Sequence, residues 1–366
     1  MPRASWFISA LLLAAVVTTL ALFKLIDVVG VGSAWTGIDI AGRLVETAAR
    51  MRAEESEVTR IGVIGDSTVI AYPGDRSVPN RLEGLLGSGA AGYRVYDFSH
   101  VGFGPPEQWA IADIVAGAKP DWVVLGLNLA SLSPAWEAAP RRPELVGWIE
   151  PRRLPGAATL LSRMGMTFDQ IASAVAMVRW GSENVWKTVR HRQIQVEKTR
   201  RRLLGRLGGP IERPPAYPFG KSVGSYGETP EGREQLASVL GEQYAAIFDG
   251  IEPDRISLAL LDETIRVLAR SGAQVVVLAV PMNIEVLRIQ PFYDEAGLEQ
   301  TIQSLAQVVE SAGGQLVDLH DDFSADGFRD VGGHLTLSPI DGPLRVAESL
   351  AQVIQSERSL DSEDRD

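Results

Sequence analysis

The feature that most limits the possible folds is a regular alternation of short, strongly apolar segments with longer amphipathic ones. The apolar segments are dense in Val, Ile and Leu, which is typical of strands buried on both faces of a parallel sheet. The expected strands are 61–65, 93–99, 121–128, 273–281 and 315–320, and the expected helices are 76–86, 106–118, 255–270, 298–311 and a last one after Ser338. This order predicts an α/β fold of three layers, with a mostly parallel sheet between two layers of helices.

Composition narrows the class of protein further. The chain has 366 residues, enough for one large or two ordinary domains, and a formal net charge of −11. Duplex nucleic acid is therefore an unexpected partner, because binding to phosphates requires a basic surface. The sequence contains no cysteine, which excludes disulfides, thiolate metal sites and a cysteine nucleophile.

The N-terminus predicts a membrane anchor. Residues Ala4–Phe23 carry no charge, and Arg3 precedes them. About 20 apolar residues suffice to cross a bilayer as a helix, and the preceding positive charge favours a cytoplasmic N-terminus. A cleaved signal peptide is the alternative, although the apolar run is longer than usual for one. We therefore expect residues 1–30 to form a single-pass anchor in the cell membrane, with the main domain outside the cytoplasm.

The rest of the chain divides by pattern. Residues 31–57 have helical spacing and predict a juxtamembrane helix, and residues 58–356 contain the strand and helix alternation. Proline-rich segments interrupt that alternation from about 135 to 250, which indicates a helical insertion. Residues 357–366 are polar and are expected to form a disordered tail.

Within the expected insertion, a long helical stretch over 168–207 carries many basic residues. Its Lys and Arg residues cluster between Lys187 and Arg206. A solvated helical face is the ordinary explanation of such charges, and a surface for acidic lipid, an anionic polymer or a membrane-protein partner is the alternative.

The first expected strand ends in the sequence Gly65-Asp66-Ser67. Ligand sites in parallel α/β folds lie beyond the carboxyl ends of the strands, so Ser67 is a candidate nucleophile if a base can reach it. Asp and Ser are also preferred residues at helix N-termini, so a purely structural capping role is the alternative.

Polar residues and glycines also follow the other strands. The second strand leads into "SHVGFG", with Gly102 and Gly104, and the third ends at Asn128, whose amide can donate a hydrogen bond. His334 lies in the loop before the last helix, four residues after Asp330. Together these residues supply a nucleophile, hydrogen-bond donors, a base and a carboxylate that can orient the base.

These blocks, in this order, resemble the SGNH hydrolases, also called the GDSL-type family, over roughly residues 58–356. The resemblance implies a flavodoxin-like SGNH hydrolase fold, with Ser67 as nucleophile and His334 as general base. It also implies an oxyanion hole made by the N–H groups of Ser67 and Gly102 and the side chain of Asn128. The loop around Gly102 is similar to the Asn-Leu-Gly-x-x-Gly-Tyr-Gly loop of membrane-associated members, with Asp97 where Asn is usual.

Two positions depart from the family's pattern. The acid usually lies three residues before the histidine, whereas here that residue is Val331. A bulge at the extra glycine would bring Asp330 into reach, since glycine tolerates unusual backbone angles; otherwise Asp326 or a carbonyl oxygen would orient the imidazole. Leu129 stands where the family often has an Asp outside the catalytic set.

The resemblance implies an anchored serine esterase or O-acyltransferase that acts on acyl esters, with acetyl groups on envelope glycans as the natural substrate class. A non-catalytic scaffold in a polysaccharide assembly complex is the second hypothesis, supported by the irregular spacing of Asp330 and His334 and by the insertion. A ligand-binding flavodoxin-like domain is a weaker third hypothesis.

No cofactor is expected, because the sequence contains neither a phosphate-binding loop nor a dinucleotide fingerprint. No metal is expected either. His320 lies among Asp318, Asp321 and Asp322, but adjacent acids in one loop more often form a solvated surface than a metal site.

Overall fold

The computed structural model describes residues 31–137, 145, 149, 153–171 and 222–363, apart from residues 56, 71, 73, 88–91, 168 and 228. The apolar segment Ala4–Phe23, predicted to anchor the chain, lies outside these residues. Among the helices that the structure does describe, none is both long enough and apolar enough to cross a bilayer.

A five-stranded parallel sheet forms the centre of the fold. Its strands are β1 (Thr59–Ile64), β2 (Tyr93–Asp97), β3 (Trp122–Leu127), β4 (Gln274–Ala279) and β5 (Gln315–Asp318). They pair in the order β2-β1-β3-β4-β5, with each described pair parallel. This is the strand order of flavodoxin-like folds. All residues of β3 are buried, as expected for an apolar strand covered on both sides, so the α/β prediction is confirmed.

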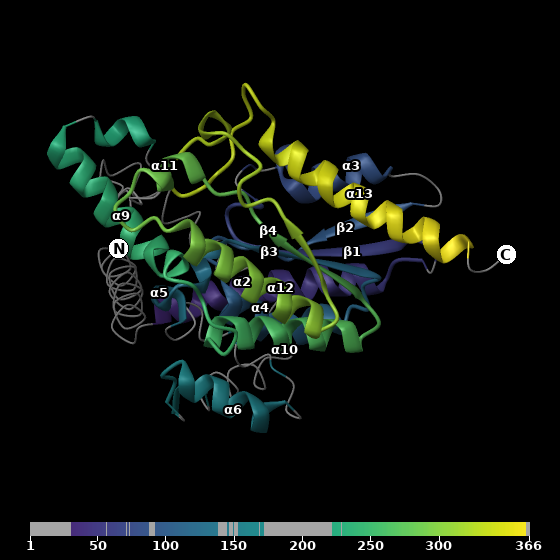
Figure 1. Ribbon diagram of the computed structural model, residues 1–366. Helices are drawn as coiled ribbons and strands as arrows, with labels where there is room; N and C mark the ends of the chain where they lie inside the picture. The colour runs from purple at the N-terminus through teal and green to yellow at the C-terminus, as the bar shows by residue number, and fades with distance from the viewer. Residues whose placement is uncertain are drawn as a thin grey trace, which may run out of the picture.

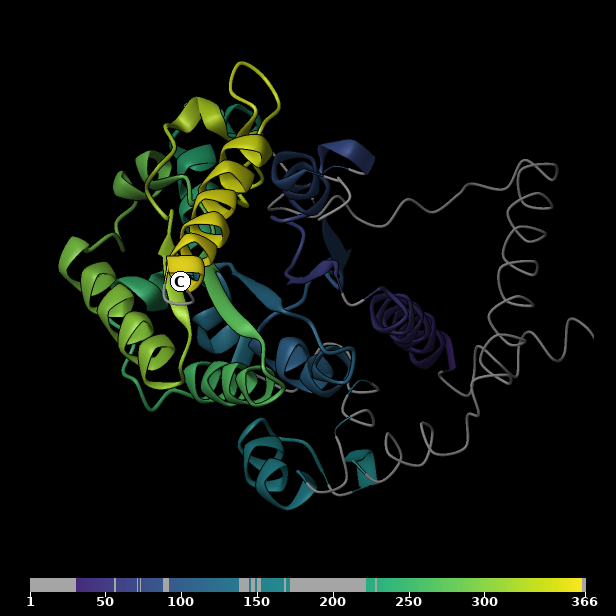
Figure 2. The same cartoon turned by 90° about the vertical axis from the view of Figure 1, so that its right-hand side faces the viewer.

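Helices cover both faces of the sheet, as Figures 1 and 2 show from two directions. One face is covered by α3 (Val78–Leu86) and α13 (Gly342–Glu363), which pack against each other. The core on this side joins Ile61 and Val63 of β1 to Leu82 of α3 and Leu350 of α13.

The other face is covered by α4 (Pro105–Ala116), α10 (Ile256–Arg270) and α12 (Glu295–Ser311). Alternate residues of the strands point to this side, so that Val123 and Leu125 join its core while Val124 joins the opposite one. This alternation explains why nearly every residue of the central strands is apolar.

Helix α2 (Val31–Arg52) lies within residues 31–57, which were expected to form a juxtamembrane helix, and it packs against the α/β core. Its residues Ile40, Leu44, Ala48 and Met51 are buried in the same core as α4 and β3. They recur at helical spacing along one face of the helix. The sequence pattern correctly predicted this helix but did not show which surface its apolar face would contact.

The structure describes only part of the expected insertion over 135–250. Its last part forms α9 (Pro230–Phe248), which packs against α12 and buries Leu240, Tyr244 and Phe248 in the core. The predicted helix over 168–207 and its basic cluster lie outside the described residues, apart from 169–171, which are helical.

The remaining helical segments are short. They are η1 (Gly74–Arg76), η2 (Leu129–Leu132), α5 (Pro134–Glu137), α6 (Leu154–Arg163), η5 (Val223–Tyr226), α11 (Ile284–Arg288) and η6 (Ala325–Gly327). The C-terminal segment differs from the expectation of a disordered tail at 357–366, because α13 continues to Glu363. A polar sequence without glycine or proline can extend a helix into solvent once the preceding turns are packed.

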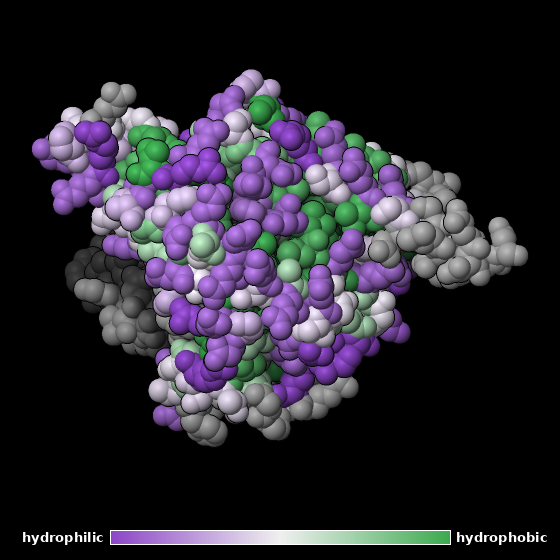
Figure 3. Space-filling view, viewed as in Figure 1, coloured by the Kyte–Doolittle hydropathy of each residue, from purple (hydrophilic) through white to green (hydrophobic). Residues whose placement is uncertain are grey.

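The face of the molecule shown in Figure 3 is mostly hydrophilic. Hydrophobic residues show between α12 and α13, where the edge strand β5 lies with Leu316 and Val317 half-buried. An edge strand is covered on fewer sides than a central one, so its side chains remain partly accessible.

Candidate active site

Ser67 lies in a tight turn directly after β1 and is half-buried. No helix begins there: α3 begins at Val78, and the side chain of Ser77 caps it by accepting a hydrogen bond from the N–H of Asn80. The alternative that Ser67 is a helix cap is therefore wrong, and its hydroxyl is free of that structural role.

The turn is shaped by two glycines on neighbouring strands. A Cβ atom at Gly65, at the end of β1, would lie 2.6 Å from Cγ2 of Val69, and one at Gly126 in β3 would lie 2.5 Å from the same methyl group. Both distances are well below van der Waals contact. Glycine at both positions thus lets Val69 fold back onto the strand ends, which turns the chain sharply at Ser67.

The imidazole of His334 reaches Ser67 from the loop before α13. Its Nε2 atom lies 2.9 Å from Oγ of Ser67, and its Nδ1 atom lies 2.9 Å from both carboxylate oxygens of Asp330. A carboxylate can only accept, so Nδ1–H donates to Asp330, and Nε2 is left to accept the hydroxyl proton of Ser67. Three side chains named from the sequence therefore meet in the geometry of a nucleophile, a base and an orienting acid.

The four-residue spacing between Asp330 and His334 is accommodated by the loop itself. Gly333 has a φ angle of 81°, in the region that favours glycine, and the backbone N–H groups of Gly332 and His334 both donate to Oδ1 of Asp330. The chain thus wraps around the carboxylate, which is only 3% exposed. The bulge at the extra glycine is confirmed, and Asp330, rather than Asp326, contacts the imidazole.

The loop is held at its base by backbone pairing. The N–H of Arg329 donates to the carbonyl of His334 at 2.9 Å, and Phe328 forms an antiparallel bridge with Leu335. Arg329 also donates from Nε to Oδ2 of Asp330 at 3.3 Å, and its guanidinium stacks over Tyr72.

Asn128 and Gly102, the expected oxyanion donors, lie on the two strands that flank β1. Asn128 follows β3, which pairs with β1 up to Ile64 and Leu125. Gly102 lies in a turn after β2, and this loop stays attached to β1 because the N–H of His100 donates to the carbonyl of Gly65 at 3.0 Å. The three strand ends therefore stand side by side at one edge of the sheet.

The amide of Asn128 is oriented by its own loop. Its Oδ1 accepts from the N–H of Ala130 at 3.1 Å. The nitrogen of a primary amide carries two N–H donors, so the Asn128 side chain can donate to an oxyanion.

Asp66 is a site residue that the sequence presented only as a possible cap. It is 4% exposed, and its Oδ1 accepts from the backbone N–H and the hydroxyl of Thr68 at 2.8 and 2.5 Å. Burial raises the pKa of Asp66, while the hydrogen bonds from Thr68, the charge of His334 and the bond with Asn128 oppose that rise. The sequence feature that pointed to Asp66 as a site residue was its position between Gly65, at the end of the strand, and Ser67.

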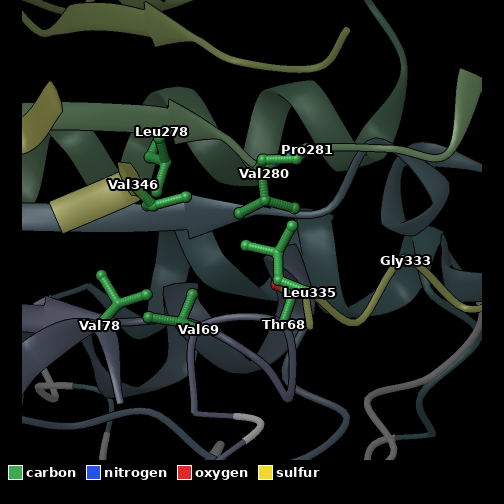
Figure 4. Close-up of a pocket in the computed structure, with 9 residues that line it drawn as sticks. All are labelled: Thr68, Val69, Val78, Leu278, Val280, Pro281, Gly333, Leu335 and Val346. Atoms are coloured by element: carbon green, nitrogen blue, oxygen red, sulfur yellow. The ribbon is translucent and has the colours of Figure 1, made fainter. Parts of the chain in front are cut away.

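An apolar cavity lies beneath the turn that carries Ser67, on the side of α3 and α13 (Figure 4). The cavity is small, with a volume of about 10 Å³ available to the centre of a water-sized molecule. Its lining residues are Thr68, Val69, Val78, Leu278, Val280, Pro281, Gly333, Leu335 and Val346. Most of these side chains belong to the hydrophobic core on that face, so the cavity supplies no charged group to the site.

The other two histidines that the structure describes, His100 and His320, contact residues close to them in the chain. His100 stacks on Phe103, and its Nδ1 lies 2.9 Å from the carbonyl of Val101. Nδ1 of His320 lies 2.7 Å from Asp318. Burial, the largest single effect, lowers the pKa of His320, but the hydrogen bond to Asp318 and the negative charges of Asp318, Asp321 and Asp322 together leave that pKa raised. Within the described ranges, no group of three acidic or histidine side chains is arranged to hold a metal ion.

No family model matches this chain, and no curated protein matches it either.

Proposed function

We propose that this protein is a serine esterase or O-acyltransferase of the SGNH type. One observation carries the proposal: Oγ of Ser67, the two nitrogens of His334 and the carboxylate of Asp330 form an unbroken chain of contacts at 2.9 Å. This arrangement is suited to activating a hydroxyl for attack on an ester.

In the proposed reaction, Nε2 of His334 takes the proton of Ser67 as Oγ bonds to the carbonyl carbon of the ester. The carbonyl electron pair moves onto oxygen, and the N–H groups of Ser67 and Gly102 and the amide of Asn128 stabilise this oxyanion. The intermediate then collapses, the alkoxide leaves, and His334 returns the proton to it. A water molecule or a sugar hydroxyl, deprotonated by His334, then attacks the acyl-enzyme. The bond between the acyl carbon and Oγ of Ser67 breaks, the acid or the acylated sugar leaves, and His334 returns the proton to Oγ.

The proposed substrates are acyl esters, in particular acetyl esters, of glycans in the cell envelope. This class comes from the resemblance to anchored SGNH hydrolases. The uncharged segment Ala4–Phe23 supports the same assignment, because an anchor would hold the domain outside the cytoplasm, where such glycans lie. The half-buried position of Ser67 is compatible with attack on an ester at the surface of a polymer.

The test is covalent labelling with a fluorophosphonate, combined with hydrolysis of p-nitrophenyl acetate. We expect the wild type to be labelled at Ser67, and Ser67→Ala to lose labelling and at least ~10³-fold in kcat/KM. Ser77→Ala is the matched control. It removes a serine that caps α3, so we expect a loss of stability of about 1 kcal/mol with labelling intact.

An unlabelled wild type, or a Ser67→Ala variant with full activity, would contradict the proposal and favour the non-catalytic scaffold. Labelling of Ser67 without hydrolysis of small esters would assign the protein to the acyltransferases. The irregular spacing that supported the scaffold from the sequence no longer does so, because Asp330 contacts His334 directly.

A further inference from the structure

Arg43 of α2 contacts the segment that leads into the Gly102 loop. Its Nη2 donates to the carbonyl of Ser99 at 2.7 Å, and its Nη1 lies 3.4 Å from the carbonyl of Asp97. Both carbonyls lie at the carboxyl end of β2, just before the loop turns. Nothing in the sequence indicates this contact, because Arg43 is more than 50 residues away in the chain.

Among the strands that the structure describes, none supplies a partner for these carbonyls. Within that part of the chain β2 is an edge strand that pairs with β1 alone, and the N–H groups of Phe98 and His100 donate towards β1 at 2.8 and 3.0 Å. In an extended strand, alternate residues direct their polar groups to opposite sides. The backbone N–H and C=O groups of Asp97 and Ser99 therefore point away from β1, to the open side of the edge strand. Backbone groups there still require hydrogen-bond partners.

At this open side, side chains form the hydrogen bonds that a neighbouring strand would otherwise supply. Arg43 supplies donors to the two carbonyls, and the carboxylate of Asp97 accepts from the N–H of Ser99 at 2.8 Å. Arg43 is itself fixed in place, because its neighbour Leu44 is fully buried in the core.

The far end of the loop is also held. The carbonyl of His100 accepts from the N–H of Phe103 at 3.1 Å, which closes the turn containing Gly102. The N–H of Gly104 donates to Oε2 of Glu107 at 3.0 Å. Arg43 therefore contacts the open side of the segment where the loop begins, and Glu107 contacts the residue where it ends.

We infer that Arg43 is a positioning residue that fixes the Gly102 loop so that its backbone N–H can stabilise the oxyanion. This inference rests on the proposed function. A donor to the oxyanion is used only in the transition state, so a displaced loop lowers kcat and leaves KM nearly unchanged.

The test compares Arg43→Met with Arg52→Met in the full-length protein. Arg52 is a matched control because it lies on the same helix and donates to the carbonyl of Gly117 at 2.9 Å, remote from the strand ends. With p-nitrophenyl acetate, we expect Arg43→Met to lower kcat by about 10- to 100-fold, with KM within about 2-fold. We expect Arg52→Met to keep wild-type kcat. We expect Arg43→Lys, which keeps a cationic donor group but not the two separate nitrogens of the guanidinium, to lose less kcat than Arg43→Met.

A second measurement does not depend on activity. Amide hydrogen exchange over residues 98–104 should accelerate in Arg43→Met and stay unchanged in Arg52→Met. Unchanged exchange in Arg43→Met, or equal losses of kcat in both variants, would overturn the inference. If the wild type resists fluorophosphonate but Arg43→Met accelerates exchange, the proposed function fails, and Arg43 positions a loop with no oxyanion to bind, which also overturns its catalytic part.

Discussion

At the scale of single residues, Gly333 decides whether Asp330 can orient His334. Its φ of 81° lets the chain wrap around the carboxylate, so that the N–H groups of Gly332 and His334 both reach Oδ1. A Cβ at Gly333 would meet only ordinary contacts, at 3.6 Å from the carbonyl of Pro281. Substitution there would therefore act through backbone strain and not through steric overlap.

We predict that Gly333→Ala lowers both stability and activity. A positive φ costs a non-glycine residue about 1–2 kcal/mol, and relaxation of the loop would pull Asp330 away from Nδ1 of His334. We expect kcat for p-nitrophenyl acetate to fall by at least ~10-fold.

Gly313→Ala is the control for this prediction. Gly313 has a φ of 86°, no atom within 4 Å of an added Cβ, and a position before β5, at the opposite edge of the sheet. It should show a similar loss of stability with unchanged kcat. Equal activity of the two variants would show that the bulge does not position Asp330.

At the scale of elements, the turn after β1 depends on the fit of Val69 over the ends of β1 and β3. The methyl group Cγ2 of Val69 occupies the space that side chains at Gly65 and Gly126 would need. The two strands and the turn thus pack closely against one another. Substitutions at Val69 and at the two glycines should therefore have non-additive effects on the unfolding free energy.

We predict that Gly126→Ala and Val69→Ala are coupled. Gly126→Ala overpacks the turn and should cost about 1–3 kcal/mol of unfolding free energy. Val69→Ala leaves a cavity and should cost a comparable amount. The double variant should lose at least ~1 kcal/mol less than the sum, because the smaller side chain leaves room for the new Cβ. Urea denaturation of the four proteins measures this coupling.

Gly84→Ala provides the comparison. Gly84 is exposed in α3, with no atom within 4 Å of an added Cβ, so its substitution should stabilise the helix by about 0.5–1 kcal/mol. The effects of Gly84→Ala and Val69→Ala on stability should add. If the effects of Gly126→Ala and Val69→Ala were also strictly additive, the proposed packing of Val69 against Gly126 would be contradicted.

At the scale of the whole molecule, α2 contacts both the hydrophobic core and the end of β2. It is the first described helix after the predicted membrane anchor. Leu44 packs in the core, and the adjacent Arg43 contacts the end of β2. A helix that served only as a linker would show neither contact.

We predict that Leu44→Ala lowers the unfolding free energy by about 2–5 kcal/mol, as expected for a fully buried leucine. Ala49→Gln, on the exposed face of the same helix, should change it by less than about 0.5 kcal/mol. Thermal or urea unfolding of the two variants is the measurement. Similar stability of both would mean that α2 is not part of the folding unit.

The sequence alone was sufficient to predict the layered α/β architecture and to place Ser67 and His334 at one site, where they lie 2.9 Å apart. Parallel strands buried on both faces must be continuously apolar, and helices at the surface must be amphipathic, so both leave a local pattern. The carboxyl ends of parallel strands lie at one edge, which is why Ser67 and His334 could be assigned to the same site before their distance was known.

Tertiary structure decided what local patterns do not record. The pattern around α2 shows an apolar face but not the surface that it covers, so this helix was expected to lie outside the domain, and the residues of α9 were expected to belong to an insertion within it. The turn at Ser67 is not a helix because Val69 fits over glycines on two strands, one of them about 60 residues away. The carbonyls at the open edge of β2 accept hydrogen bonds from Arg43. A backbone group without a partner strand needs another donor, and which side chain supplies it depends on the tertiary fold.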